Sequence, residues 1–210
     1  MRNVLRLAVV CTAALATACT DAETARIRET TRPTYDKATG RLTELTYGAN
    51  KNGKIDTWTD MDGNKPLRSR IDLDEDGTLD RWEYYGPAGE LVKVGFSRAR
   101  DGRPDAWAYS GPDGKVQRIE ISSTHDEQKI DRWERYDATG LVAADEDTDH
   151  DGRADKWETF VNGALATAAF DENHDGTPDR RLTYANGQLT SIESEPDGSG
   201  AFTKRVAVHP

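Results

Sequence analysis

Cysteine is almost absent from this sequence of 210 residues, and its absence limits both the fold and the chemistry of the protein. The two cysteines, Cys11 and Cys19, both lie within the first 19 residues. The rest of the chain therefore has no thiol for a disulfide or for a cysteine-ligated zinc ion. Histidine is also scarce, and no two of the four histidines stand at a ligand spacing, so the sequence alone predicts no zinc site.

Apolar residues and positive charge are also in short supply. Hydrophobic residues make up 35% of the chain and the mean hydropathy is −0.81, which is low for one compact core. This composition predicts a thin, extended structure or partial disorder when metal is absent. The net charge of −10 argues against binding to nucleic acid or to anionic lipid headgroups.

Motifs of the common enzyme classes are missing as well. The sequence contains no G-x-S-x-G nucleophile elbow, no Walker phosphate loop and no H-E-x-x-H zinc motif. Carboxylates are plentiful, but they fall in short acidic loops that recur along the chain, and these loops explain their number. We therefore predict that the chain is not an enzyme. A hydrolase, which would need paired carboxylates in a deep cleft, is the least favoured function.

The chain divides into three parts. Residues 1–18 are predicted to be a signal peptide, because two early arginines precede an apolar run over residues 7–18 that is too short to span a membrane. Residues 19–33 are polar and are expected to form a lipid anchor and tether. Residues 34–208 hold the repeats and are expected to form one domain.

The residues around Cys19 resemble a bacterial lipobox. Ala16-Thr17-Ala18 places small residues directly before the cysteine, although alanine stands where the lipobox usually has leucine. The resemblance implies that Cys19 carries a lipid, and Thr20 in place of aspartate implies the outer membrane or the cell surface. The alternative is ordinary cleavage at an A-x-A site, which would leave a secreted or periplasmic protein.

One short pattern recurs along the chain at a fixed period. An aspartate closes an acidic loop, and a tryptophan follows two residues later in all but the last copy, so that all five tryptophans are used in this way. Successive aspartates are 24, 25, 26, 24 and 24 residues apart, and they are Asp56, Asp80, Asp105, Asp131, Asp155 and Asp179. A period of this size indicates one supersecondary unit repeated along an array.

Each unit reads as a β-hairpin. The Asp-x-Trp strand ends in a turn, such as Asn162-Gly163 or Asn186-Gly187, which is the strongest short hairpin signal. The returning strand carries apolar residues at its start, at +3 and at +5, and the +3 step predicts a bulge or strong twist. We predict an all-β meander of about seven hairpins in an extended twisted sheet or solenoid, with a closed barrel or propeller as the alternative. The tryptophans are expected to cover the apolar face of the sheet, and the alternative is an exposed row that binds sugars or peptides.

The acidic loops have the spacing of a calcium site, and the second loop is the most complete. Asp72, Asp74, Asp76, Asp80 and Glu83 occupy positions 1, 3, 5, 9 and 12, and Gly77 stands at position 6. Calcium takes six to eight oxygens, which alternate carboxylates on a tight turn can supply. Position 7 would contribute a backbone carbonyl. The ligands predicted for the second loop are Asp72, Asp74, Asp76, Thr78, Asp80 and Glu83.

Two further loops are predicted to bind calcium, and three are not. The fifth loop is complete and the sixth lacks a carboxylate at position 12, so we expect weaker binding there. The predicted ligands are Asp147, Asp149, Asp151, Arg153 through its carbonyl, Asp155 and Glu158 in the fifth loop, and Asp171, Asn173, Asp175 and Asp179 in the sixth. The first, third and fourth loops are expected to be ion-free turns closed by hydrogen bonds.

These loops and hairpins resemble known families in two ways. The loop spacing is similar to that of EF-hands and of thrombospondin type 3 repeats, while the hairpins with Trp, Tyr and Gly resemble MORN-like repeat proteins of bacteria. The resemblance implies a calcium-binding, lipid-anchored repeat protein of the cell envelope with a structural or surface-binding role. The expected partners are calcium ions, a membrane reached through the lipid, and a surface glycan or protein. The alternative is a carbohydrate- or peptide-recognition module that uses exposed Trp and Tyr.

Overall fold

The computed structural model describes residues 30–50 and 52–208. The predicted signal peptide, the predicted lipid site at Cys19 and most of the predicted tether lie outside these residues. Among the described residues, no helix has the length and apolar character needed to cross a membrane.

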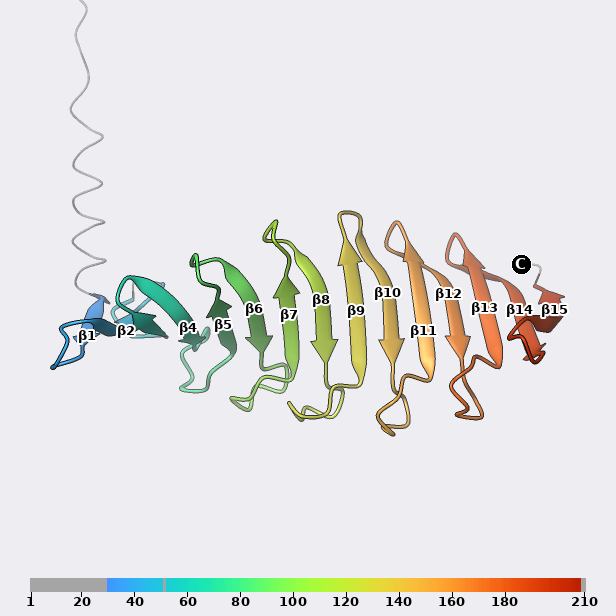
Figure 1. Ribbon diagram of the computed structural model, residues 1–210, viewed down its shortest axis with the longest axis horizontal. Coiled ribbons are helices and arrows are strands. Elements are labelled where there is room, and N and C mark those ends of the chain that lie inside the picture. Colours follow the sequence, from blue (N-terminus) through green and yellow to red (C-terminus); the bar gives the residue numbers. More distant parts are fainter. Residues whose placement is uncertain (1–29, 51, 209–210) are drawn as a thin grey trace, which may run out of the picture.

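The described chain forms one open antiparallel sheet of fifteen strands (Figure 1). The strands lie in the sheet in the order in which they occur in the sequence, so each one pairs only with its neighbours in the chain. This arrangement confirms the all-β hairpin meander, and the alternative of a closed barrel or propeller is wrong. The strands are β1 (Arg32–Tyr35), β2 (Leu42–Tyr47), β3 (Thr57–Asp62), β4 (Lys65–Ile71), β5 (Arg81–Tyr85), β6 (Leu91–Phe96), β7 (Ala106–Ser110), β8 (Val116–Ile121), β9 (Arg132–Asp137), β10 (Gly140–Glu146), β11 (Lys156–Val161), β12 (Ala164–Phe170), β13 (Arg180–Ala185), β14 (Gln188–Pro196) and β15 (Phe202–Ala207).

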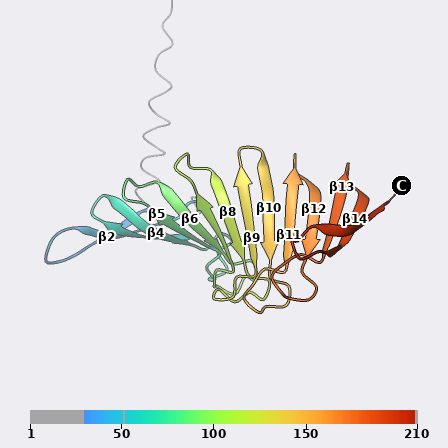
Figure 2. The ribbon, with the colours of Figure 1, turned by 45° about the vertical axis from the view of Figure 1, so that its right-hand side comes forward.

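The ends of the strands form the two long edges of the sheet, and the connections along these two edges differ in kind. Short hairpin turns join the strands of each unit along one edge, while the longer acidic loops join successive units along the other edge (Figure 1). Figure 2 shows that the sheet twists and curves along its length, as the right-handed twist of each strand requires. All acidic loops therefore follow one another along a single edge.

Each hairpin carries a bulge at the same place, as the +3 apolar step predicts. In the unit of β5 and β6, Tyr84 pairs with Lys93 but Tyr85 pairs with Leu91, so Val92 is the additional residue. The same shift occurs in the unit of β11 and β12, between Thr159 and Phe160. The extra residue increases the local twist, which suits a sheet that coils rather than lies flat.

The tryptophans form one row on one face, which we call the tryptophan face. Residues directly opposite one another in antiparallel strands share a face, and the register places the side chains in an unbroken line. The row runs through Trp58, Arg70, Trp82, Gly95, Trp107, Glu120, Trp133, Asp145 and Trp157. Trp82 is buried and the other tryptophans are half-buried. The apolar residues Val94, Ala108 and Ile119 lie in one row on the opposite face, so the tryptophans do not cover that row.

Burial is concentrated near the acidic edge rather than in a central core. Among the described residues, the buried hydrophobic side chains are Trp82, Val94, Ala106, Ala108, Ala144 and Ala168. The buried polar residues are more numerous and include seven aspartates, all of them at the ends of acidic loops. Since a buried carboxylate must be hydrogen-bonded or bound to a cation, these loops carry much of the specificity of the fold.

Candidate metal loops

Six acidic loops connect the units along one edge of the sheet (Figure 1). We number them in chain order, and they span residues 48–56, 72–80, 97–105, 122–131, 147–155 and 171–179. The second, fifth and sixth loops share one pattern of hydrogen bonds, in which the first and the last aspartate of the loop both accept bonds from backbone amides of the same loop.

The closing aspartate of each of these loops accepts a hydrogen bond from the second residue of the same loop. The amide nitrogen of Leu73 lies 2.7 Å from Asp80 Oδ2, that of Thr148 lies 3.0 Å from Asp155 Oδ2, and that of Glu172 lies 2.7 Å from Asp179 Oδ2. Each closing carboxylate therefore ties the two ends of its loop together.

The opening aspartate holds the glycine at position 6. The amide of Gly77 donates to Asp72 Oδ2 over 2.9 Å, and Gly152 and Gly176 donate to Asp147 and Asp171 over 2.8 Å and 2.7 Å. Gly77 has a φ of 93°, a left-handed conformation that only glycine adopts without strain. The glycine is therefore required by the turn and not by contact with an ion.

The middle carboxylates accept hydrogen bonds within their own loops. Asp76 Oδ1 accepts from the amide of Thr78 over 2.7 Å, and Asp151 Oδ1 accepts from the amide of Arg153 over 2.8 Å. In the sixth loop the hydroxyl and the amide of Thr177 donate to Asp175 and lower the pKa of that carboxyl. The bonds from Thr177 thus favour the ionised form of Asp175.

The loops gather carboxylate oxygens closely enough for a metal ion in two places within single loops. Oxygens of Asp72, Asp74 and Asp80 lie within 4.8 Å of one another in the second loop, and oxygens of Asp147, Asp149 and Asp151 do so in the fifth. The second loop has one further feature. Asp72 is only 6% exposed, and its Oδ1 atom is buried without a hydrogen-bond partner.

The two glutamates at position 12 are not members of these carboxylate groups and lie in strands β5 and β11. Glu83 Oε1 is 2.8 Å from the Nε atom of Arg81, and Glu83 Oε2 accepts from the hydroxyl of Tyr85 over 2.5 Å. Burial and the bond to Glu83 raise the pKa of Tyr85 to about 12. The second glutamate is on the same face, in β11. The structure thus places both side chains on the sheet, where their oxygens already have partners.

Glu158, the second of these glutamates, joins two strands. Its carboxylate lies 3.0 Å from Lys156 Nζ and 3.0 Å from Arg132 Nη1. Burial disfavours its ionised form, but the bonds from Lys156 and Arg132 outweigh burial and lower the pKa of Glu158. The group therefore acts as an ion-pair partner between β9 and β11 in this structure.

The fourth loop is one residue longer than the other acidic loops, so counting back from its closing aspartate gives the wrong opening residue. Ser122 opens it, because the amide of Ser122 donates to the carbonyl of Asp105 over 2.8 Å, as the amide of Asp72 donates to that of Asp56 over 2.9 Å. Ser122 is fully buried, and its Oγ accepts from the amide of Asp126 over 3.1 Å. Counting back from Asp131 misses this serine, and the 26-residue spacing is the signal that would have revealed it.

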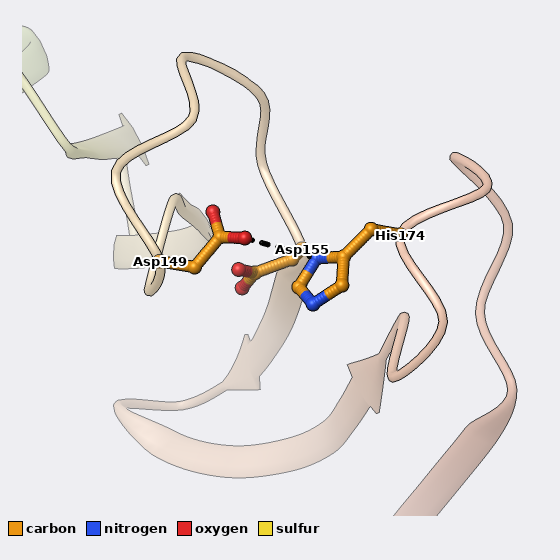
Figure 3. A group of neighbouring side chains, drawn as sticks. All are labelled: Asp149, Asp155 and His174. Carbon is orange, nitrogen blue, oxygen red and sulfur yellow. Dashed lines mark ion pairs between the residues drawn. The ribbon is translucent and has the colours of Figure 1, made fainter.

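The residue at position 4 reaches into the preceding loop. Glu75, His125, His150 and His174 all have φ between 60° and 63°, a left-handed conformation that turns the side chain away from its own loop. His125 contacts Asp105 of the third loop, His150 Nδ1 lies 3.5 Å from Asp131 Oδ2, and His174 Nδ1 lies 3.2 Å from Asp149 Oδ2 (Figure 3). Sequence reasoning missed these contacts because the spacing within one loop does not show how neighbouring loops pack against each other.

Comparison with known proteins identifies no family. No family model matches the sequence, and no curated protein matches it. S. aureus TarM matches over 53% of this chain and 23% of TarM, with a TM-score of 0.38 and 12% identity. The accessory secretory protein complex of Streptococcus pneumoniae matches with a TM-score of 0.37 and 14% identity over 51% of this chain and 19% of that chain.

The pneumococcal O-GlcNAc transferase GtfA also matches, with a TM-score of 0.20 and 16% identity over 54% of this chain and 17% of GtfA. The present chain thus spans less than a quarter of the length of these proteins. The comparison contradicts the prediction that this chain is not an enzyme, because TarM and GtfA are glycosyltransferases. We withdraw that prediction. At these TM-scores the likeness assigns neither an activity nor a substrate to this chain.

Proposed function

We propose that this protein is an extended repeat sheet of the cell envelope that binds calcium along its acidic edge, first at the second loop. The observation that carries the proposal is the unpartnered Oδ1 atom of Asp72. This buried atom belongs to a carboxylate that lies beside those of Asp74 and Asp80. A buried carboxylate oxygen without a partner is destabilising, and three neighbouring carboxylates repel one another. A hard divalent cation supplies the missing partner and neutralises the group.

The fifth and sixth loops are weaker calcium sites under this proposal. In the fifth loop both oxygens of Asp147 already accept amide hydrogen bonds, from Asp151 over 3.2 Å and from Gly152 over 2.8 Å. In the sixth, Asn173 replaces a carboxylate and its amide group donates to Asp179 over 3.0 Å. Each loop keeps free lone pairs for an ion, but an ion relieves no orphaned oxygen there.

The test of the second loop is an Asp72→Asn variant of the purified protein, measured by calorimetric titration of calcium and by thermal unfolding. Extracellular calcium modules of this kind bind with a Kd of about 10⁻⁴ to 10⁻³ M. Calcium at ten times its Kd would stabilise the folded chain by about 1.4 kcal/mol. We expect Asp72→Asn to lose most of this gain in calcium while changing little in EDTA.

The matched control is Asp101→Asn in the third loop. Asp101 accepts from the amide of Arg103 over 3.0 Å, much as Asp76 accepts from Thr78 in the second loop, yet the third loop opens with Ser97 in place of an aspartate. This variant should leave the calcium response unchanged. Equal melting temperatures of the unmodified protein with calcium and with EDTA would refute the proposal.

We also propose that a lipid on Cys19 anchors the sheet to the outer membrane or the cell surface. The support is the Ala16-Thr17-Ala18-Cys19 sequence after an apolar run. We expect Cys19→Ser to move the protein from the membrane fraction to the soluble fraction, since covalent lipidation supplies the membrane affinity. Retention of Cys19→Ser in the membrane fraction would contradict this anchor, and loss of export would show that the leader rather than the lipid was affected.

A second candidate function is recognition of a surface glycan or protein by the tryptophan face. The observation in its favour is the common register of the five tryptophans, of which only Trp82 is buried. However, Lys93 Nζ lies 3.7 Å from the centre of the Trp107 ring and so covers part of this ring. A ligand stacking at that point must displace the lysine, which already makes a favourable cation–π contact. The calcium role is therefore the primary proposal.

A further inference from the structure

The space between the fifth and sixth loops gathers donors from two successive repeats. Ligand atoms of Asp149, Asp155 and His174 lie within 4.8 Å of one another. His174 comes from the sixth loop and points back at two carboxylates of the fifth, with its Nδ1 atom 3.2 Å from Asp149 Oδ2 (Figure 3). Among the described residues, the other groups of this kind contain carboxylates alone.

A small cavity lies beside this group, and two of its three residues, Asp155 and His174, line the cavity. It has a volume of about 20 Å³ and is lined in part by Asp155, Asp171 and His174. A volume of this size holds one water molecule or one ion. Asp155 and Asp171 are each only 6% exposed, so the carboxylates at its wall are shielded from bulk water. The positively charged Arg153 also lines the cavity.

We propose that the space between the fifth and sixth loops is a binding site for a borderline divalent metal of the zinc class, held by Asp149, Asp155 and His174. Imidazole nitrogen favours zinc and similar metals, whereas sites made only of carboxylate and carbonyl oxygen suit calcium and magnesium. Three protein ligands also leave a coordination position open for water. The histidine that reaches back from the next repeat thus changes the metal preference of an otherwise oxygen-only loop.

Comparison of the loops explains why, among the residues that the structure describes, a group containing histidine occurs between the fifth and sixth loops. Arg100 stands at position 4 of the third loop, as His174 does in the sixth, and its side chain offers no metal ligand to the second loop. The third and fourth loops do receive a histidine, but His125 and His150 each face a single buried aspartate, Asp105 and Asp131 respectively. Those two histidines are explained as ion-pair partners, which makes His125 a matched control for His174.

The inference rests on the proposed function in one respect, because the fifth loop supplies carboxylates to both its proposed calcium site and the proposed zinc site. Calcium bound by Asp147, Asp149 and Asp151 would share Asp149 with zinc. The second loop shares no residue with the zinc site, so the response of Asp72→Asn to calcium and the response of His174→Ala to zinc are independent. Failure of one therefore leaves the other standing.

The test is calorimetric titration of the purified, chelator-stripped protein with Zn²⁺ in calcium-free buffer, for the unmodified chain, His174→Ala, Asp149→Asn and His125→Ala. We expect one strong zinc site whose affinity falls about tenfold or more in His174→Ala and in Asp149→Asn, and which His125→Ala retains. The imidazole signals of His174 should shift on zinc addition in the NMR spectrum.

Zinc affinity that is equal in His174→Ala and in the unmodified chain would overturn the proposal, and so would an equal loss in His125→Ala. The absence of any stoichiometric zinc binding would also overturn it, and would leave the contact between His174 and Asp149 as an ion pair. Because the side chain of His174 is 47% exposed, His174→Ala should fold, and its far-ultraviolet circular dichroism provides the check.

Discussion

At the scale of single residues, acidic loops with the same spacing differ in whether the Oδ1 atom of the opening aspartate has a hydrogen-bond partner. The Oδ1 atom of Asp72 is buried without a partner, whereas the corresponding oxygen of Asp147 accepts an amide hydrogen bond over 3.2 Å. Two loops with the same acidic spacing therefore differ in what an ion would supply. In the second loop the amide of Asp76 donates to Asp74 over 3.3 Å, whereas in the fifth the amide of Asp151 donates to both Asp147 and Asp149. The identity of the aspartates does not reveal this difference.

Gly95 is a second residue whose role depends on one close approach. It stands in the tryptophan row opposite Trp107, and a Cβ atom added to it would lie 2.5 Å from the Trp107 ring. We expect Gly95→Ala to destabilise the sheet by about 1 to 3 kcal/mol, because the ring must leave its place beneath Lys93. Denaturant unfolding, together with the near-ultraviolet circular dichroism of tryptophan, measures this loss.

Gly198→Ala is the control for this substitution. A Cβ atom at Gly198 meets nothing within 4 Å, and the residue has no left-handed φ. The free energy of unfolding of the variant should therefore lie within about 0.5 kcal/mol of that of the original protein. Equal stability of Gly95→Ala and Gly198→Ala would show that the Trp107 ring moves without loss.

At the scale of elements, the strands are joined by charges as well as by backbone hydrogen bonds. Arg132 on β9 donates to Glu146 on β10 over 3.2 Å and to Glu158 on β11 over 3.0 Å, so one guanidinium connects three strands. Lys156 on β11 adds a contact of 2.9 Å to Glu146. Networks of this kind contribute more than isolated surface pairs, since each charge has several partners.

Glu158→Gln tests this network and the position-12 ligand together. The pKa of Glu158 is lowered in the folded state, so its ionisation stabilises the fold above the unfolded pKa and this contribution is lost as the pH falls through the lowered folded value. In EDTA at neutral pH we expect Glu158→Gln to lower the free energy of unfolding by about 1 kcal/mol, and the difference should vanish in acid.

Calcium titration of the same variant shows whether Glu158 also binds an ion. Its carboxylate is engaged by Arg132 and Lys156 in the structure, so we expect the calcium affinity of the fifth loop to be unchanged. A weaker calcium affinity, with no loss of stability in EDTA, would instead identify Glu158 as the position-12 ligand that the loop spacing predicts.

At this scale the sequence reveals the units and their period but not how neighbouring loops meet. The Asn-Gly turns, the +3 apolar step and the Asp-x-Trp repeat predict the hairpins and their bulges, because each depends on local backbone chemistry. The reach of His125 and His174 into the preceding loop depends on a left-handed φ at a non-glycine residue. That conformation recurs at position 4 of the second to sixth loops, but the spacing within one loop does not show which residue of the preceding loop the side chain meets.

At the scale of the whole molecule, the sheet is quasi-one-dimensional. Every strand between β1 and β15 pairs with the strand before it and the strand after it, and with no other. The stability of such an array is close to a sum of repeat terms and nearest-neighbour terms. The row of tryptophans and the edge of acidic loops extend with each added unit, so neither depends on closure of the sheet.

Deletion of residues 132–155, which comprise β9, β10 and the fifth loop, tests this arrangement. The deletion joins Asp131 to Lys156 and so restores the usual sequence of a closing aspartate followed two residues later by a tryptophan, here Trp157. Register is kept because Trp133 and Trp157 occupy the same row, and a one-residue slip would instead turn every following side chain to the other face. We expect a soluble, cooperatively folded sheet with a moderately lower melting temperature. Deletion of β10 alone should be far more damaging, because β9 and β11 run in the same direction and lose the strand that lies between them. Complete unfolding after removal of the whole unit, measured by circular dichroism and calorimetry, would mean that distant repeats stabilise one another.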